Sequence, residues 1–204
     1  MARTWQDILH TFEHFLKAPH EIGAVLPSSR FLARRMMKAV DLKQANSIVE
    51  LGAGTGAITG ELLLHVSPGA SVVIIDSNPE AVAILNRRLA GQKNLRIILG
   101  DARELRNILK ENQIGNVDAI VSSLPYASLG EGTTRHILSA AADVLTPQGH
   151  FVAFQYTPLL RKTLEAYFEI QSSEVELRNF PPAVVYRCVA KENKKERLNL
   201  KNIA

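Results

Sequence analysis

Short apolar runs alternate with longer stretches of helical spacing along the chain from residue 47 onward. The first four runs are almost continuously apolar, which is typical of strands buried on both faces of a parallel sheet. In the stretches between the runs, apolar residues recur every three or four positions, which predicts helices. The predicted strands are Ser47–Leu51, Ser71–Asp76, Leu95–Leu99, Val117–Ser122 and His150–Tyr156, and the predicted helices are Thr55–Val66, Glu80–Ala90, Arg103–Asn112 and Thr133–Leu145.

The last part of this pattern is different. Two runs, Glu174–Arg178 and Ala183–Ala190, are joined by a short segment with Phe180-Pro181-Pro182, which predicts an antiparallel hairpin. Together with the five preceding strands, the hairpin defines the expected fold class. It is α/β, with a Rossmann-like, doubly wound, mostly parallel seven-stranded sheet and an antiparallel C-terminal edge.

Two helices are expected before the sheet. Residues 5–16 carry an apolar stripe at helical spacing, and Ser28 or Ser29 can cap a second helix. The apolar side of that second helix carries Phe31, Leu32, Met36 and Val40, and its other side carries Arg30, Arg34 and Lys38. No linker divides the chain, so we expect one domain (1–204), with N-terminal helices that form a membrane or substrate cap (1–46), a core (47–190) and a basic tail (191–204).

The composition excludes several classes of protein. Of the 204 residues, 46% are hydrophobic and 22% are charged, which is typical of a globular chain and not of a disordered or fibrous one. A single cysteine excludes a disulfide framework and a Cys-based zinc cage, and the six histidines lack metal-ligand spacing, so no metal is expected. With neither a signal peptide nor a spanning apolar stretch, we expect a cytoplasmic protein.

The net charge of +4 is unevenly distributed. Residues 1–40 and 191–204 each carry +3, whereas residues 41–190 carry −2. Basic ends favour an anionic surface, either a membrane or a nucleic acid. A solvated helix face and a frayed tail are an equally good explanation from charge alone.

A glycine-rich segment follows the first predicted strand, in Glu50-Leu51-Gly52-Ala53-Gly54-Thr55-Gly56. Glycines at such a strand–helix turn let the backbone approach a ligand, as in dinucleotide sites, and with Ala57 the segment also fits a nicotinamide site. Asp76 ends the second strand and Asp101 follows the third, so both acids are expected at the edge of the sheet where ligands bind. Asp76 is placed to accept hydrogen bonds from ribose hydroxyls, Asp101 from an adenine amino group, and Glu50 suits a ligand that carries an ammonium.

With these acids at this spacing, residues 47–190 resemble the class I S-adenosylmethionine-dependent methyltransferases. The resemblance implies S-adenosyl-L-methionine as the cofactor, with its methionine part on the glycine loop, its ribose on Asp76 and its adenine on Asp101. The cofactor-binding residues are then expected to be Glu50, Gly52, Ala53, Gly54, Gly56, Asp76, Ser77, Asp101, Ala102 and Ser122. An ordinary βα turn with three surface acids is the alternative.

The fourth strand ends in Ser122-Ser123-Leu124-Pro125-Tyr126, which resembles the Asn/Asp-Pro-Pro-Tyr and Asn-Leu-Pro-Tyr motifs of enzymes that methylate amino nitrogens. In those enzymes a side-chain oxygen and a backbone carbonyl accept hydrogen bonds from the target nitrogen, and the aromatic ring packs on the substrate. The resemblance implies that Ser123, Leu124, Pro125 and Tyr126 are catalytic. Ser123 replaces Asn or Asp, which argues against a planar adenine as the target. A proline turn without a catalytic role is the alternative.

Three segments narrow the family further: Pro19–Arg34, Ser123-Leu124-Pro125 and Pro181–Arg187. They resemble small bacterial phospholipid N-methyltransferases, which convert phosphatidylethanolamine stepwise to phosphatidylcholine and bind anionic membrane through an N-terminal amphipathic helix. The resemblance implies that residues 3–17 bind the membrane, on the inner face of the plasma membrane, and that the substrate is a lipid amine. No obligate protein partner is inferred.

Two other functions remain open from the sequence. Tyr126 is closer to the RNA adenine dimethyltransferases, so an adenine-N6 methyltransferase acting on RNA is one alternative, although about 14 residues after the last strand leave no room for the C-terminal helical domain of those enzymes. A non-catalytic regulator that binds the adenosyl cofactor is the other. For residues 5–16, packing on the chain's own domain competes with membrane binding.

Overall fold

The computed structural model describes residues 30–40 and 42–191. Several predictions lie outside this part of the chain: the helix at residues 5–16, membrane binding by residues 3–17, and the cap at Ser28 or Ser29. Residues 192–204 of the basic tail lie outside it as well. No helix within it is long and apolar enough to cross a membrane.

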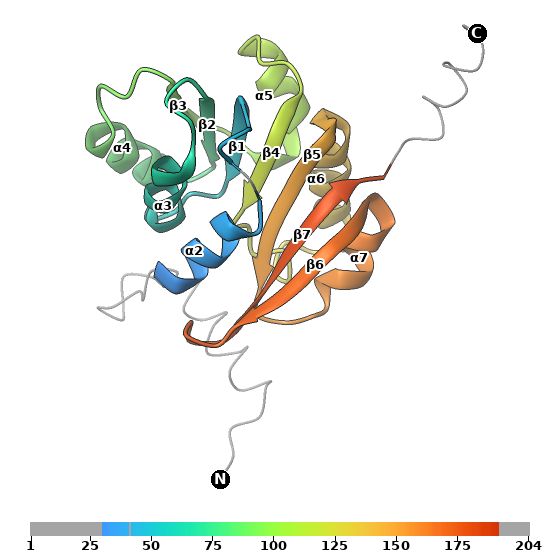
Figure 1. Cartoon of the computed structure of the whole chain (residues 1–204). Helices are drawn as coiled ribbons and strands as arrows, with labels where there is room; N and C mark the ends of the chain where they lie inside the picture. The colour runs from blue at the N-terminus through green and yellow to red at the C-terminus, as the bar shows by residue number, and fades with distance from the viewer. Residues whose placement is uncertain (1–29, 41, 192–204) are drawn as a thin grey trace, which may run out of the picture.

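Seven strands form a single sheet (Figure 1). Its order is β3-β2-β1-β4-β5-β7-β6, and all strands run parallel except β7, which is antiparallel to both of its neighbours. The strands are β1 (Ser47–Leu51), β2 (Ser71–Asp76), β3 (Leu95–Leu99), β4 (Val117–Ser122), β5 (Leu145–Gln155), β6 (Phe168–Glu176) and β7 (Ala183–Ala190). The predicted fold class, including the antiparallel C-terminal edge, is confirmed.

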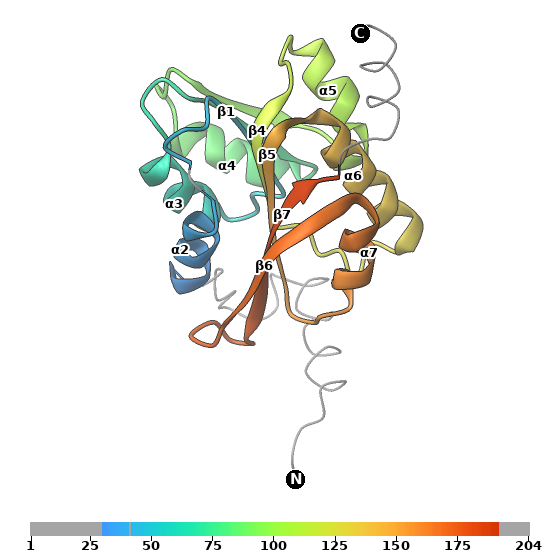
Figure 2. The same ribbon diagram turned by 45° about the vertical axis from the view of Figure 1, so that its right-hand side comes forward.

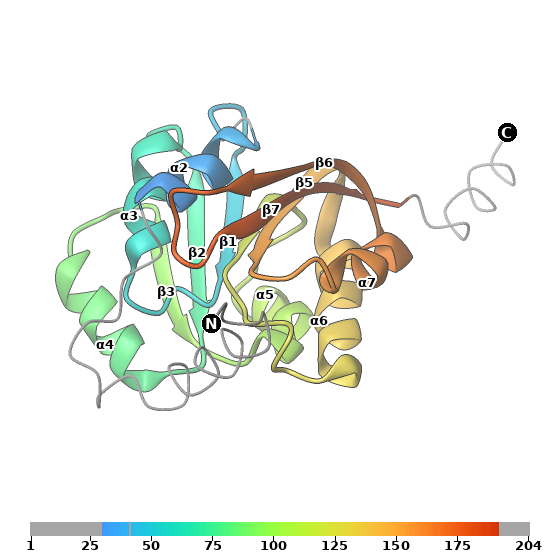
Figure 3. The ribbon, with the colours of Figure 1, turned by 90° about the horizontal axis from the view of Figure 1, so that it is seen from below.

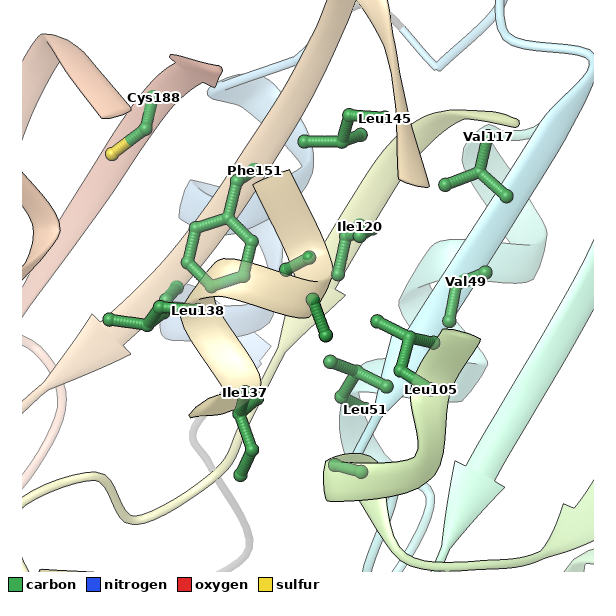
Figure 4. Packing of buried hydrophobic residues seen from close by; sticks show 14 of the residues in the cluster. Val49, Leu51, Leu105, Val117, Ile120, Ile137, Leu138, Leu145, Phe151 and Cys188 are labelled. Carbon is green, nitrogen blue, oxygen red and sulfur yellow. The ribbon is translucent and has the colours of Figure 1, made fainter. Parts of the chain in front are cut away.

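Helices cover both faces of the sheet, as the views in Figures 2 and 3 show. On one face lie α2 (Arg30–Lys38), α3 (Ala57–His65) and α4 (Pro79–Arg88), and on the other lie the 3₁₀ turn η1 (Ala102–Glu104), α5 (Leu105–Glu111), α6 (Glu131–Val144) and α7 (Leu160–Tyr167). Alternate strand residues supply the two cores: Val49 and Leu51 face α5 and α6, whereas Ile48, directly before Val49, faces α2 and α3. Figure 4 shows the core on the side of α5 and α6.

The structure differs from the sequence-based expectation in three elements. The helix α7 was not expected, since only two of its eight residues, Leu160 and Leu164, are buried. The strand β6 begins six residues earlier than expected, at Phe168, because as an edge strand it exposes most of its side chains. The strand β5 begins at Leu145, five residues early, and includes Pro147 and Gly149, which usually indicate a turn.

The helix α2 is held on the β6–β7 hairpin by ion pairs. Arg35 pairs with Glu174 and with Glu176, the latter at 3.2 Å. Phe31, expected on the buried side of this helix, is 43% exposed, and the guanidinium of Arg178 lies 4.4 Å from the centre of its ring. The start of α2 and the end of β6 therefore form one joined surface.

Candidate active site

The glycine loop lies at the carboxyl end of β1, in the middle of the sheet. Gly52, Gly54 and Gly56 all have positive φ angles, of 77°, 51° and 81°, which L side chains rarely adopt. The Gly52 amide donates a hydrogen bond to the Ile75 carbonyl (2.9 Å), and the Gly54 amide donates one to Asp76 Oδ2 (2.8 Å). Hydrogen bonds to β2 therefore fix the shape of the loop.

Gly52 also lies against the predicted acceptor motif. A Cβ atom on Gly52 would lie 2.8 Å from Leu124 Cδ2, which is closer than van der Waals contact allows. The Ser123 amide donates a hydrogen bond to the Leu51 carbonyl (2.9 Å), so the turn after β4 is joined to the same strand end. A side chain at position 52 would displace the end of the Leu124 side chain, so glycine here lets the loop and the predicted acceptor motif pack closely.

The two predicted acids differ in their surroundings. Asp76 is only 7% exposed, and its second oxygen accepts a hydrogen bond from the Asn78 amide (2.8 Å). Asp101 is more open and is bound by the Arg103 guanidinium at 2.9 and 2.6 Å. These hydrogen bonds lower the pKa of Asp101 from its ordinary value, so its carboxylate is ionised at neutral pH. Both side chains are available as acceptors, because each carboxylate oxygen takes more than one hydrogen bond.

A cavity of about 340 Å³ opens at this edge of the sheet. Six of the predicted site residues line it: Gly52, Asp76, Ser77, Asp101, Ala102 and Leu124. The other predicted residues, Glu50, Ala53, Gly54, Gly56, Ser122, Ser123, Pro125 and Tyr126, do not line it. The sequence did not indicate the opposite wall, which includes Arg103, Leu129, Thr133 and Ile137 from η1, α6 and the loop before α6.

Glu50 is fully buried at the end of β1. Among the described residues, neither oxygen of its carboxyl group has a hydrogen-bond partner with good geometry. Burial raises the pKa of Glu50 to about 7, and the negative charge of Asp76 adds to this effect, while the nearby Thr59 hydroxyl opposes it. An unpaired buried carboxylate is costly, so this position favours a ligand that brings a positive charge.

Tyr126 differs from its expected role. It was expected to pack its ring on the substrate, but it is 3% exposed and belongs to the core on the side of α5 and α6. Its hydroxyl shares a 2.8 Å hydrogen bond with Ser122 Oγ, and burial raises the pKa of the phenol above its ordinary value. Tyr126 therefore stays neutral at neutral pH, and we infer that it supports the turn from the inside. The same bond turns Ser122 inward, away from the cavity.

The backbone carbonyl of Leu124 is already used inside the protein. It accepts hydrogen bonds from the Tyr126 amide (2.9 Å) and from Gln155 Nε2 (3.0 Å). Two donors fill the two lone pairs of this oxygen, so it has no capacity left for a target nitrogen. The Ser123 hydroxyl oxygen, by contrast, is buried and has no partner among the described residues. It is the free acceptor of the motif.

Gln155 is a further residue of this site that sequence analysis missed. It ends β5, is 6% exposed, and reaches across 31 positions of sequence to the Leu124 carbonyl. Nothing in the local pattern indicates this contact, because it depends on the pairing of β5 with β4. A buried glutamine at the carboxyl end of a central strand is the one signal that could have singled it out.

We expect Gln155→Leu to lower turnover about 5-fold without changing cofactor affinity, because the Leu124 carbonyl loses a hydrogen bond of about 1 kcal/mol. Steady-state kinetics and calorimetry with the cofactor check this. Gln171→Leu is the matched control, since Gln171 is exposed on β6 and bonds only to Glu169. A variant at position 155 with wild-type turnover, or with equally weakened cofactor binding, would contradict the positioning role.

Comparisons with known proteins bear directly on this site. The family model described as a methyltransferase domain matches residues 48–149, from β1 into β5. An ornithine lipid N-methyltransferase of Singulisphaera acidiphila is 32% identical over 175 residues, which cover 85% of this chain and 91% of that protein. The chain belongs to the class I S-adenosylmethionine-dependent methyltransferases. Its cofactor is S-adenosylmethionine, and the nicotinamide alternative is wrong.

Other relatives of this methyltransferase match over less of their length. The ribosomal RNA small subunit methyltransferase A of Thermotoga neapolitana is 30% identical over 115 residues, and the match covers 56% of this chain and 41% of that protein. Among solved structures, TrmN from Thermus thermophilus has a TM-score of 0.68 at 21% identity and covers 88% of this chain and 53% of its own. The N-methyltransferase NodS from Bradyrhizobium japonicum with S-adenosyl-L-homocysteine has a TM-score of 0.66 at 16% identity. The match covers 91% of this chain and 99% of that chain. These structures show the fold.

The residues of the cavity fit S-adenosylmethionine. Around Gly54 there is no atom within 4 Å of where a Cβ would lie, so the loop leaves open space beside its backbone. We infer that Asp76 would hold the ribose hydroxyls, Asp101 and the Ala102 amide the adenine, and Glu50 the methionine ammonium. Among the described residues, no group of three metal-ligating side chains lies close enough to hold a metal ion.

Proposed function

We propose that this methyltransferase transfers the methyl group to the primary amine of a membrane lipid headgroup, phosphatidylethanolamine first of all. The observation that carries the proposal is the free acceptor of the motif, the buried Ser123 hydroxyl next to a Leu124 carbonyl that is fully used. One hydroxyl suits an aliphatic amine, whose lone pair is already localised on nitrogen and needs only to be aimed. The lone pair of a planar exocyclic amine is delocalised into its ring, so such an amine needs two acceptors, one for each N–H group, to hold the nitrogen in a tetrahedral geometry.

The match to the Singulisphaera acidiphila protein supports the same class of substrate, because it extends over almost the whole of a lipid N-methyltransferase. Ornithine lipid and phosphatidylethanolamine share a primary aliphatic amine on a lipid anchor. Ornithine lipid is therefore the second candidate substrate, favoured by that relative. The sequence segments that resemble phospholipid N-methyltransferases favour phosphatidylethanolamine.

The chain's own contribution to the reaction is alignment and exclusion of water. The bound cofactor supplies a methyl group on a positively charged sulfur, and in the transfer a carbon–sulfur bond breaks as a carbon–nitrogen bond forms. The amine must first release a proton to solvent, which at pH 7 costs about 4–5 kcal/mol for an amine with a lysine-like pKa. Ser123 Oγ accepts a hydrogen bond from the neutral amine, and Gln155 and Tyr126 hold the turn that carries it.

We also propose that residues 3–17 bind the anionic membrane surface, as their amphipathic sequence suggests. Binding of this kind would place the methyltransferase at the inner face of the plasma membrane. The second candidate function, methylation of adenine N6 in RNA, is favoured by Tyr126 and by the match to the ribosomal RNA enzymes. That match covers less than half of the Thermotoga neapolitana protein.

Methyl incorporation from isotope-labelled S-adenosylmethionine tests the proposal. The purified full chain is incubated with vesicles containing phosphatidylethanolamine, vesicles containing ornithine lipid, and ribosomal RNA fragments. We expect label in phosphatidylethanolamine, and none in either lipid with Asp76→Ala, which removes a ligand of the cofactor. Label in ornithine lipid alone would show that the substrate is ornithine lipid and not phosphatidylethanolamine. Label in RNA alone would overturn the lipid proposal.

A further inference from the structure

The turn that joins β6 and β7 lies at the same edge of the sheet as the cavity. The strand β6 runs parallel to β5, so its end at Glu176 points the same way as the carboxyl ends of the central strands. In the register of the sheet, Gln155 pairs with Val184 and Val184 pairs with Val175. The hairpin tip, residues 177–182, joins β6 to β7 (Figure 1), and by this register it lies just beyond Gln155, the residue that holds the acceptor motif.

In the hairpin tip, large apolar side chains are exposed to solvent and a polar side chain is buried. Leu177 is 76% exposed and Phe180 is 80% exposed, whereas Asn179 between them is 4% exposed. Arg178 folds back onto the buried Glu176, with hydrogen bonds of 2.9 and 3.0 Å, and Asn179 Nδ2 donates to the Pro181 carbonyl (2.8 Å). The polar residues of the tip thus hold its backbone, and its two large apolar side chains point outward.

More apolar side chains are exposed around the tip. Val175, on the same hairpin, is 52% exposed, and Leu159, in the loop between β5 and α7, is 75% exposed at the same edge. Among the described residues, the comparably exposed leucine outside this edge is Leu64 on α3, at 78%. Exposed apolar residues that gather at one edge are typical of an interaction surface.

Two basic side chains flank this apolar surface. Arg30 opens α2, which lies beside the tip (Figure 3), and Lys162 is in the first turn of α7, three residues after Leu159. Both are exposed, and neither forms an ion pair within residues 30–40 and 42–191. The acids Glu174 and Glu176 nearby are already paired with Arg35 and Arg178. An apolar centre with a basic rim complements an anionic bilayer, whose surface attracts cations and whose interior takes apolar side chains.

We propose that the hairpin tip, through Leu177 and Phe180, inserts into an anionic membrane surface and docks the open edge of the methyltransferase on the bilayer that contains its substrate. This inference rests on the proposed function for the identity of the substrate. The anchor is formed by folded residues that are separate from residues 3–17. It places Ser123 and the cavity over the lipid headgroups, so that a headgroup amine reaches the site without leaving the bilayer.

Flotation with vesicles tests the inference in the full chain. The double variant Leu177→Ser/Phe180→Ser is compared with wild type on phosphatidylglycerol-rich and on pure phosphatidylcholine vesicles, both at low and at high salt. We expect wild type to float with the anionic vesicles at low salt, and the variant to partition at least about 10-fold less. Leu64→Ser is the matched control, with an equally exposed leucine away from the edge, and it should float as wild type does.

Turnover on a short-chain phosphatidylethanolamine, kept below its micelle concentration, separates docking from catalysis. The variant should methylate this monomeric substrate at the wild-type rate and lose at least about 10-fold only on vesicles. Equal losses on both substrates, or a lower melting temperature, would assign the tip a structural or catalytic role and overturn the inference. Wild-type flotation of the variant, binding of RNA in place of vesicles, or a dimer that the variant dissociates would overturn it as well.

Failure of the proposed function gives a different result. A protein that floats through its tip but methylates no lipid would refute the lipid substrate and leave the docking surface intact. A protein that methylates vesicle lipid equally well with and without the tip would refute the docking surface and leave the substrate intact.

Discussion

Replacing Glu50 with glutamine is expected to make the cofactor-free protein more stable at pH 8 and, at the same time, to weaken its binding of S-adenosylmethionine. The carboxyl group of Glu50 is fully buried and lacks a hydrogen-bond partner with good geometry among the described residues, which raises its pKa to about 7. Glutamine has the same shape and carries no charge. It therefore removes the cost of burying the carboxylate, together with the charge that would hold the methionine ammonium.

The direction of the pH dependence follows from the two pKa values. In the unfolded chain Glu50 titrates near 4.5, and in the folded protein near 7. Between these values the folded state holds a proton that the unfolded state has lost, so the free energy of unfolding falls as pH rises. The stability that the neutral carboxyl group contributes is complete below about pH 4.5 and lost above about pH 7, and amounts to about 3 kcal/mol.

Thermal melts and calorimetry at pH 5 and pH 8 measure both effects. At pH 8 the melting temperature of Glu50→Gln should lie about 5–10 °C above that of wild type without cofactor, and its affinity for S-adenosylmethionine should fall about 10- to 100-fold. Glu111→Gln is the control, because Glu111 is exposed at the end of α5. A Glu50→Gln variant that is less stable at pH 8 and binds the cofactor as wild type does would contradict the assigned role.

Replacing Gly52 with alanine is expected to lower cofactor affinity and turnover together, each by about 100-fold, or about 2.7 kcal/mol. Two causes add up. The residue has a φ of 77°, which costs a side chain about 1 kcal/mol or more, and its new methyl group would lie 2.8 Å from Leu124 Cδ2. To relieve this contact the end of the Leu124 side chain must move, and this side chain lines the cavity.

Gly91→Ala separates the backbone cost from the damage to the site. Gly91 has a φ of 90°, and a Cβ there would meet nothing within 4 Å, in the loop after α4. Both variants should lose stability in thermal melts, Gly52→Ala more because of its contact with Leu124, whereas only Gly52→Ala should lose cofactor affinity in calorimetry. Equal cofactor affinity in both variants would mean that the contact between the loop and Leu124 does not matter for the site.

Local signals in the sequence were sufficient to predict the strands at the centre of the sheet. The strands β1 to β4 lie within the predicted bounds, because strands buried on both faces need unbroken apolar runs such as Val72–Ile75. The glycine loop was predictable for a similar reason. Gly52, Gly54 and Gly56 all adopt positive φ angles, and few residues other than glycine tolerate them.

The parts that were not predicted depend on contacts between distant segments. Nothing near Tyr126 in sequence shows that its ring turns inward to meet Ser122, since an aromatic residue after a proline is as compatible with the surface as with the core. The role of Gln155 depends on the pairing of β4 with β5, and the exposure of Phe31 depends on Arg178 from the far hairpin. Hydrophobic periodicity contains no information on such pairings.

Mass spectrometry of lipids extracted from bacteria that express the full chain, and that make no methylated lipids of their own, tests most directly whether this methyltransferase acts on a lipid amine. We expect phosphatidylethanolamine with one, two and three added methyl groups in cells that express wild type, and unmodified phosphatidylethanolamine in cells with equal amounts of Asp76→Ala. Unmodified lipid in both strains, with S-adenosylmethionine-dependent methyl groups found on adenines of ribosomal RNA in the wild-type strain alone, would contradict a lipid amine as the substrate.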